Sequence, residues 1–127
     1  MSSRFFILAG AINMFIAVAA GAFGAHALKH YLTPEMLAIW HTAVTYQMVH
    51  ALALLVLAML MLRLRSIWLQ RAGISMVCGI VLFSGSLYAL ALSGVRVLGA
   101  VTPFGGIGFL AGWAMLAWAA WRIESPE

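Results

Sequence analysis

Residues 5–28 read FFILAGAINMFIAVAAGAFGAHAL, a stretch of 24 residues that contains no Asp, Glu, Lys or Arg. It is long enough to cross a hydrocarbon core of about 30 Å as an α-helix, which takes roughly 20 residues. Three further uncharged stretches follow at residues 36–62, 72–95 and 97–121. The chain therefore predicts an all-α integral membrane protein with four spanning helices.

The composition supports the same class. Apolar residues make up 65% of the 127 residues and charged residues 8%, against roughly 45–50% and 25% in an ordinary soluble domain. A soluble fold of this size has too small an interior to bury so much apolar surface, so lipid must cover it. The formal net charge is +4, but the basic residues are scattered at the predicted helix ends, which does not indicate a nucleic-acid partner.

The four spans and their short loops leave room for one domain, over residues 1–127. We place the spans at about residues 5–28, 42–62, 72–93 and 104–121. Spans joined in up-down order by short loops predict an antiparallel four-helix bundle.

The second helix has a recognisable start at Thr33-Pro34-Glu35. Thr is a favoured N-cap, Pro fits the first helical position, and an acid is stabilised near the positive end of the helix dipole. A helix unbroken from Pro34 to Leu62 would be about 43 Å long, which exceeds the hydrocarbon core. We therefore expect residues 34–41 to lie partly in the membrane interface, or the helix to break there.

The distribution of basic residues predicts the orientation. With four spans, both termini and the middle loop share one side of the membrane. That side carries five arginines and the other side carries Lys29 and Arg96, so the positive-inside rule places the termini in the cytoplasm. The five arginines are Arg4, Arg63, Arg65, Arg71 and Arg122.

Small residues recur at helical spacing in the first, third and fourth stretches. Helices associate in lipid through close packing and hydrogen bonds, and small residues let their backbones approach. We expect helix–helix contacts at Gly21, Gly24, Gly79, Gly85, Gly108 and Gly112.

The second stretch is polar in one half only, over residues 41–50 (HTAVTYQMVH). Polar side chains cover more than half of the helix circumference there, and exposing them all to lipid is costly. The predicted topology brings polar residues of the other helices to the same, non-cytoplasmic half. We expect a buried or cavity-lining polar cluster of His26, His41, Thr42, Tyr46, Gln47, His50, Ser84, Ser86, Tyr88 and Thr102.

This polar cluster has two interpretations. It is a hydrogen-bond network that fixes the register of the helices, or it is a site for a small molecule or lipid, because polar groups inside membranes serve both purposes. A sizeable cavity that touches Tyr46, His50 and the third helix would favour the second interpretation.

Several chemistries are not indicated. No carboxylate lies within a span, which weakens ion-coupled transport. The histidine spacing does not favour a metal site, so haem or copper ranks third among the functions considered. The chain has no Gly-x-Ser-x-Gly elbow, phosphate loop or Cys-x-x-Cys motif. We therefore expect no enzyme activity, no catalytic residues and no cofactor.

Four segments carry a family resemblance: GAFGAHAL at 21–28, WHTAV at 40–44 with Tyr46-Gln47 and HAL at 50–52, LFSGSLY at 82–88, and LG at 98–99 with TPFGG at 102–106. In this order they resemble the YgdD-like family of small bacterial inner-membrane proteins. It is catalogued as domain of unknown function number 423, and its eukaryotic relatives are called transmembrane protein 256. The resemblance implies a four-helix protein of the bacterial cytoplasmic membrane and brings no accepted activity or catalytic residues.

Two functions remain. The first is a non-enzymatic accessory or self-associating membrane component, whose partners would be membrane lipid and a larger membrane complex or further copies of the chain. The alternative is a binding site or carrier for a small molecule or lipid in the polar half.

Overall fold

A computed structural model describes residues 1–123, which form antiparallel helices lying side by side. In chain order the elements are α1 (Ser3–His26), the 3₁₀ turn η1 (Leu28–His30), α2 (Pro34–Arg63), α3 (Ile67–Gly79), the π-helical turn η2 (Ile80–Ser84), α4 (Gly85–Ser93), the 3₁₀ turn η3 (Arg96–Ala100) and α5 (Thr102–Trp121).

Four of the resulting rods are long and apolar enough to span a membrane: α1, α2, the continuous rod Ile67–Ser93, and the rod Arg96–Trp121. The predicted all-α, four-span class is confirmed. The orientation of the termini stays a prediction.

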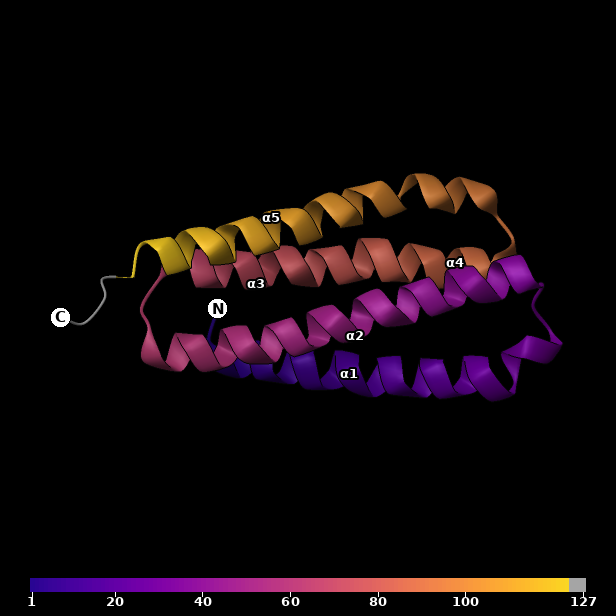
Figure 1. Cartoon of the computed structure of the whole chain (residues 1–127), viewed down its shortest axis with the longest axis horizontal. Helices are drawn as coiled ribbons and strands as arrows, with labels where there is room; N and C mark the ends of the chain where they lie inside the picture. Colours follow the sequence, from indigo (N-terminus) through magenta and orange to yellow (C-terminus); the bar gives the residue numbers. More distant parts are fainter. Residues whose placement is uncertain (124–127) are drawn as a thin grey trace.

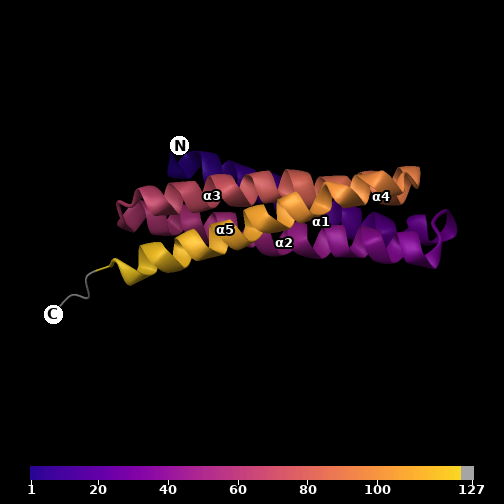
Figure 2. The same ribbon diagram turned by 90° about the horizontal axis from the view of Figure 1, so that it is seen from above.

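The rods are stacked in an order that leaves two of them on the outside. α1 packs along α2, α2 packs against the rod that contains α3 and α4, and α5 packs along α3 and η2 (Figure 1). Seen from above, α5 crosses the line of α3 and α4 at a shallow angle (Figure 2). Contacts between elements far apart in sequence therefore centre on α2 and the α3–α4 rod.

Local capping explains where the helices start. The Thr33 hydroxyl accepts a hydrogen bond from the backbone N–H of Met36 at 3.2 Å, which confirms the predicted cap of α2. The Ser66 hydroxyl caps α3 in the same manner, through the N–H of Trp68 at 3.3 Å. This cap starts α3 before the uncharged stretch and places Arg71 inside the helix. The connection between α2 and α3 is consequently only three residues, 64–66.

α2 continues without a break from Pro34 to Arg63, so the expectation of a break within residues 34–41 is wrong. Residues 35–63 contain no Pro and no Gly, the residue types that would have favoured an interruption of the helix. At 1.5 Å per residue the helix is about 45 Å long, roughly 15 Å more than a hydrocarbon core. The other expectation, that its first turns lie in the interface, stays a prediction.

The rod Ile67–Ser93 contains one irregularity, the π turn η2. A π turn is a single wide turn that interrupts the α-helical register, and such turns are frequent at functional sites. Gly105 of α5 lies against this turn, and a Cβ atom at Gly105 would overlap the backbone of Phe83. The irregular turn is therefore packed directly on α5.

Apolar packing forms two clusters along the bundle. The larger, near the end that holds the α2–α3 connection, includes Phe6, Leu54, Leu57, Leu69 and Met76, each at most 1% exposed. The smaller lies toward the opposite end and contains Leu28, Trp40, Val44 and Ala91. The buried polar side chains lie largely between these clusters.

Five of the six glycines expected at helix–helix contacts lie at such contacts. A Cβ at Gly24 would meet the Trp40 ring at 2.7 Å, one at Gly112 would meet Met76 at 2.7 Å, and one at Gly108 would meet the Ser75 carbonyl at 3.2 Å. Gly79 packs on the Phe109 ring, and Gly21 lies more loosely beside Val44.

Gly85 differs from the other five glycines. It is exposed, and nothing lies within 4 Å of a Cβ built on it. Gly85 therefore does not lie at a close helix–helix contact, contrary to the expectation.

At the end of the bundle away from the α2–α3 connection, an ion pair joins two elements. The Arg96 guanidinium donates to both carboxylate oxygens of Glu35, at 2.9 and 3.2 Å. The pair links the first turn of α2 to η3, and both side chains are exposed, at 70% and 60%.

Candidate functional site

A chain of side-chain hydrogen bonds joins α1, α2 and α4. The Tyr88 hydroxyl donates to Gln47 Oε1 at 2.7 Å, and Gln47 Nε2 donates to Asn13 Oδ1 at 3.0 Å. Asn13 Nδ2 then donates to the carbonyl of Ala9 at 2.9 Å. Gln47 is only 4% exposed, so its amide is held entirely by protein groups.

The imidazole of His50 is fixed between α2 and α5. Trp113 Nε1 lies 3.0 Å from His50 Nε2, and His50 Nδ1 lies 2.7 Å from the carbonyl of Tyr46. An indole N–H only donates, so Nε2 accepts and Nδ1 carries the proton. The ring also stacks on Phe109, with ring centroids 3.5 Å apart and an interplanar angle of 10°. This arrangement requires a neutral imidazole, because a protonated ring has no acceptor for Trp113.

Ser84, at the end of the π turn, and Ser86, just after it, form hydrogen bonds to neighbouring helices. The Ser84 hydroxyl donates to the carbonyl of Ala43 on α2 at 2.8 Å. The Ser86 and Thr102 hydroxyls share a hydrogen bond at 2.6 Å, which connects α4 to the start of α5. Ser84 and Ser86 are 1% and 7% exposed.

Buried polar atoms are satisfied throughout residues 1–123, where every buried side-chain nitrogen and oxygen has a hydrogen-bond partner. Such pairing matters most far from water, and Gln47 and His50 lie within two residues of the midpoint of α2. The expectation that these groups lie in the non-cytoplasmic half of the membrane stays a prediction.

The structure brings together seven of the ten expected residues, in separate groups rather than one cluster. Gln47 and Tyr88 form one group, and His50 forms a second with Tyr46, which is 43% exposed. The remaining three are Ser84, which bonds to α2, and the pair Ser86 and Thr102.

Three expected members lie outside these groups: His26, His41 and Thr42 are exposed. The Thr42 hydroxyl bonds only to the Ala38 carbonyl of its own helix. Thr42 was expected in the polar cluster, but the buried face of α2 is centred on Gln47 and Val44.

Two residues of these groups were not predicted, Asn13 and Trp113. Asn13 is the only asparagine of the chain and the one carboxamide within the first uncharged stretch, which is an intramembrane polar signal by itself. Trp113 lies in the middle of a span, whereas tryptophans are usually enriched at the membrane interfaces.

A groove of about 470 Å³ lies beside His50, between α2, η2 and α5. Its lining includes the aromatic rings of Tyr46, Phe83, Phe109 and Trp113, with Gly106 between them. Tyr46 packs on Phe83 at a centroid distance of 4.4 Å. The groove is therefore lined mainly by aromatic rings, and both nitrogens of the His50 imidazole are already hydrogen-bonded to the protein.

Metal-ligating side chains do not converge within residues 1–123: no three His, Cys, Asp or Glu residues there are placed to hold an ion. The single cysteine, Cys78, is exposed on α3.

The fold and these groups define a class: a small multi-pass helical membrane protein with hydrogen-bonded amide and imidazole side chains near its centre. The chain belongs to the family described as protein of unknown function DUF423, which it matches over residues 20–106. The resemblance found from the four sequence segments is thereby confirmed.

Several relatives are similar over nearly their whole length. The membrane protein UPF0382 YwdK of Bacillus subtilis is 48% identical over 92% of this chain and 96% of its own. A UPF0382 membrane protein of Staphylococcus epidermidis is 49% identical, over 94% and 98%. The UPF0382 inner membrane protein YgdD of Escherichia coli is 47% identical, over 98% and 95%. No solved structure matches the chain.

These names agree with a multi-pass protein of the bacterial inner membrane, and none of them includes an enzymatic activity.

Proposed function

We propose that this protein is a non-enzymatic membrane component that binds a lipid-soluble molecule in the aromatic groove between α2, η2 and α5. The observation that carries the proposal is the groove itself, which touches Tyr46, His50 and the π turn of the third rod. Such a cavity is what distinguishes a ligand site from a purely structural polar network.

The size and lining of the groove support a ligand of moderate size. Its volume of about 470 Å³ is within the range of roughly 300–1,000 Å³ typical of small-molecule sites. Aromatic rings offer flat faces that stack favourably on other rings. We infer that the ligand is neutral and carries a planar ring, because no charged side chain lines this groove.

The hydrogen bonds of the candidate residues favour binding over catalysis. Both nitrogens of His50 are engaged by Trp113 and the Tyr46 carbonyl, so neither is available for proton transfer while these bonds persist. The Ser84 hydroxyl is bonded to a backbone carbonyl rather than to a base that would activate it. The same bonds hold the groove walls in place, as a preformed site requires.

Photolabelling tests this proposal with benzophenone, a lipid-soluble planar aromatic ketone, as the probe. The purified protein in nanodiscs is irradiated and the labelled residues are mapped by mass spectrometry. We expect labelling to concentrate at residues 46–50 and 103–113. The variant Gly106→Leu fills the groove, because a Cβ there is 3.9 Å from Phe83, and should reduce this labelling at least fivefold (about 1 kcal/mol of lost binding).

The matched control is Gly85→Leu, which adds the same side chain where nothing lies within 4 Å. It should leave the labelling pattern unchanged. Uniform labelling of all lipid-facing residues, or equal labelling of the two variants, would overturn the proposal.

An accessory or self-associating role is the second candidate. It is supported by the outer position of α1 and α5: only 17% of the most apolar window is buried in each of their rods, against 44% in the two inner rods. Chemical crosslinking in native membranes tests it. A discrete dimer or a defined partner band supports association, and a monomer at all protein-to-lipid ratios contradicts it.

A further inference from the structure

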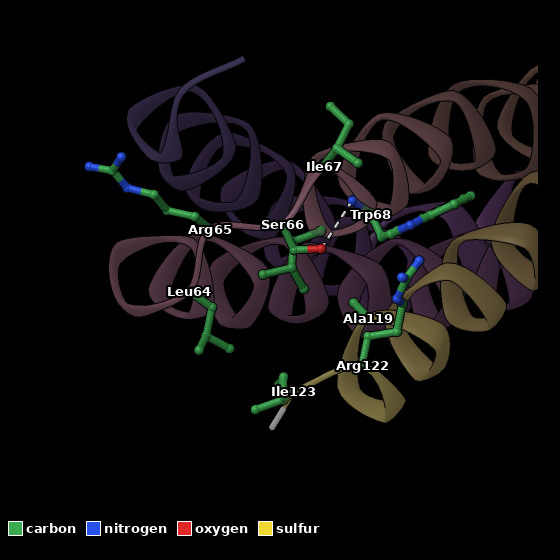
Figure 3. Close-up of a pocket in the computed structure, with 9 residues that line it drawn as sticks. Leu64, Arg65, Ser66, Ile67, Trp68, Ala119, Arg122 and Ile123 are labelled. Carbon is green, nitrogen blue, oxygen red and sulfur yellow. Dashed lines mark hydrogen bonds between the residues drawn. The ribbon is translucent and has the colours of Figure 1, made fainter. Parts of the chain in front are cut away.

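A second cavity, of about 550 Å³, lies at the opposite end of the molecule from the Glu35–Arg96 pair. It is an open cavity between the α2–α3 connection and the end of α5, and its lining includes Arg65, Ser66, Trp68 and Arg122 (Figure 3). We propose that this arginine cavity binds the headgroup of an anionic phospholipid. The proposal is independent of the aromatic groove.

The charge at this end of the bundle favours an anionic ligand. All five arginines predicted for one side of the membrane lie in the α2–α3 connection or within five residues of a helix end, and two of them, Arg65 and Arg122, line the cavity. Within residues 1–123 the only carboxylate side chain is Glu35, at the other end. Glu124 and Glu127 lie outside the described residues. Among the described residues, basic side chains are thus concentrated at this end, and such clusters attract anionic lipid headgroups.

The lining suits a lipid headgroup better than a free phosphate ion. Arg65 extends outward from the connection, while Arg122 on the opposite wall reaches toward Trp68 (Figure 3). The lining also includes apolar side chains, among them Leu64, Ile67 and Ile123. Guanidinium groups bind phosphate oxygens, and apolar walls accept the glycerol and the first methylenes of the chains.

Two tryptophans near the cavity indicate its depth in the membrane. Arg71 lies over the Trp68 ring at 5.0 Å, and Arg122 lies over the Trp118 ring at 5.8 Å. Tryptophan is enriched at the level of the headgroups. An arginine over the face of a tryptophan ring is attracted to it and is held near the same level. The cavity is therefore placed where the phosphate of a surrounding lipid lies.

Native mass spectrometry of the full chain in detergent tests the proposal, with dioleoyl phosphatidylglycerol, dioleoyl phosphatidylcholine and inorganic phosphate as separate probes. We expect the protein to retain phosphatidylglycerol at least tenfold more tightly than phosphatidylcholine, and not to retain inorganic phosphate. Equal retention of the two lipids, or retention of phosphate alone, would overturn the proposal. This comparison uses the unaltered protein and does not depend on a variant that folds.

The variant Arg65→Gln/Arg122→Gln locates the site. It should lose roughly 30-fold in affinity for phosphatidylglycerol, as expected for two arginines at an anionic headgroup. The control Arg4→Gln/Arg63→Gln removes the same charge from the same end but no cavity residue, and should change the affinity less than threefold. Equal losses in the two variants would mean a diffuse surface attraction and would contradict a built site.

Discussion

Trp113 and His50 face each other across the α2–α5 contact, with the indole nitrogen 3.0 Å from Nε2 of the imidazole. This bond fixes the tautomer of His50, because the second nitrogen must then donate to the Tyr46 carbonyl. The two hydrogen-bonded rings also form part of the wall of the aromatic groove.

Replacing Trp113 with Phe should destabilise the protein by about 1 kcal/mol, because Nε2 of His50 loses its donor in a place without water. Reversible unfolding in mixed micelles measures the change. Trp121→Phe is the control, since Trp121 is 83% exposed and its replacement should have no measurable effect. A loss equal to that of the control would mean that the His50 bond contributes nothing.

Replacing Gln47 with Leu should cost about 1–3 kcal/mol, because Asn13 and Tyr88 are both left without their partner. The combined change of Asn13→Leu, Gln47→Leu and Tyr88→Phe removes all three polar groups and should recover part of the loss. Gln70→Leu, on the first turns of α3, is the control. If the combined variant is as unstable as the sum of its members, the three residues do not act as a network.

Gly105→Ala should destabilise the packing of α5 on η2 by about 1–3 kcal/mol, because its methyl group would overlap the backbone of Phe83. Gly85→Ala adds the same methyl group to an open surface and should be neutral or slightly stabilising, since Ala is the better helix former. Thermal unfolding in the same detergent compares the two variants. The opposite order of stabilities would show that α5 does not pack on the π turn as described.

The Glu35–Arg96 pair should contribute little to stability, since both side chains are exposed and salt screens their attraction. We expect a double-mutant cycle of Glu35→Gln and Arg96→Gln to give a small coupling at low salt that disappears at high salt. A coupling unaffected by salt would indicate that the pair is shielded by lipid headgroups.

The predicted orientation can be tested with single cysteines in a Cys78→Ser background. Val95→Cys, at the end that holds η3, should react with a membrane-impermeant maleimide in intact spheroplasts. Arg65→Cys, in the α2–α3 connection, should react only after the membrane is opened. The reverse pattern would place the termini outside the cytoplasm and contradict the positive-inside prediction.

The sequence by itself determined the class, the four spans and the cap at Thr33. These depend on local properties: an uncharged run of sufficient length must cross the membrane as a helix, because lipid offers no partner for backbone groups. The four family segments likewise were sufficient to identify the family. The sequence also indicated that Gln47, His50 and Tyr88 point inward, since polar groups in a span avoid lipid.

Only the tertiary structure decided which polar groups meet. The polar composition of residues 41–50 did not distinguish the exposed Thr42 from the buried Gln47, because neighbouring helices that are distant in sequence set the buried face of α2. The π turn η2, the bond from Trp113 to His50 and the pairing of Asn13 with Gln47 depend on that packing in the same way. Hydrogen bonds between helices form wherever close contact brings two groups together, and that contact is a property of the whole bundle rather than of any one span.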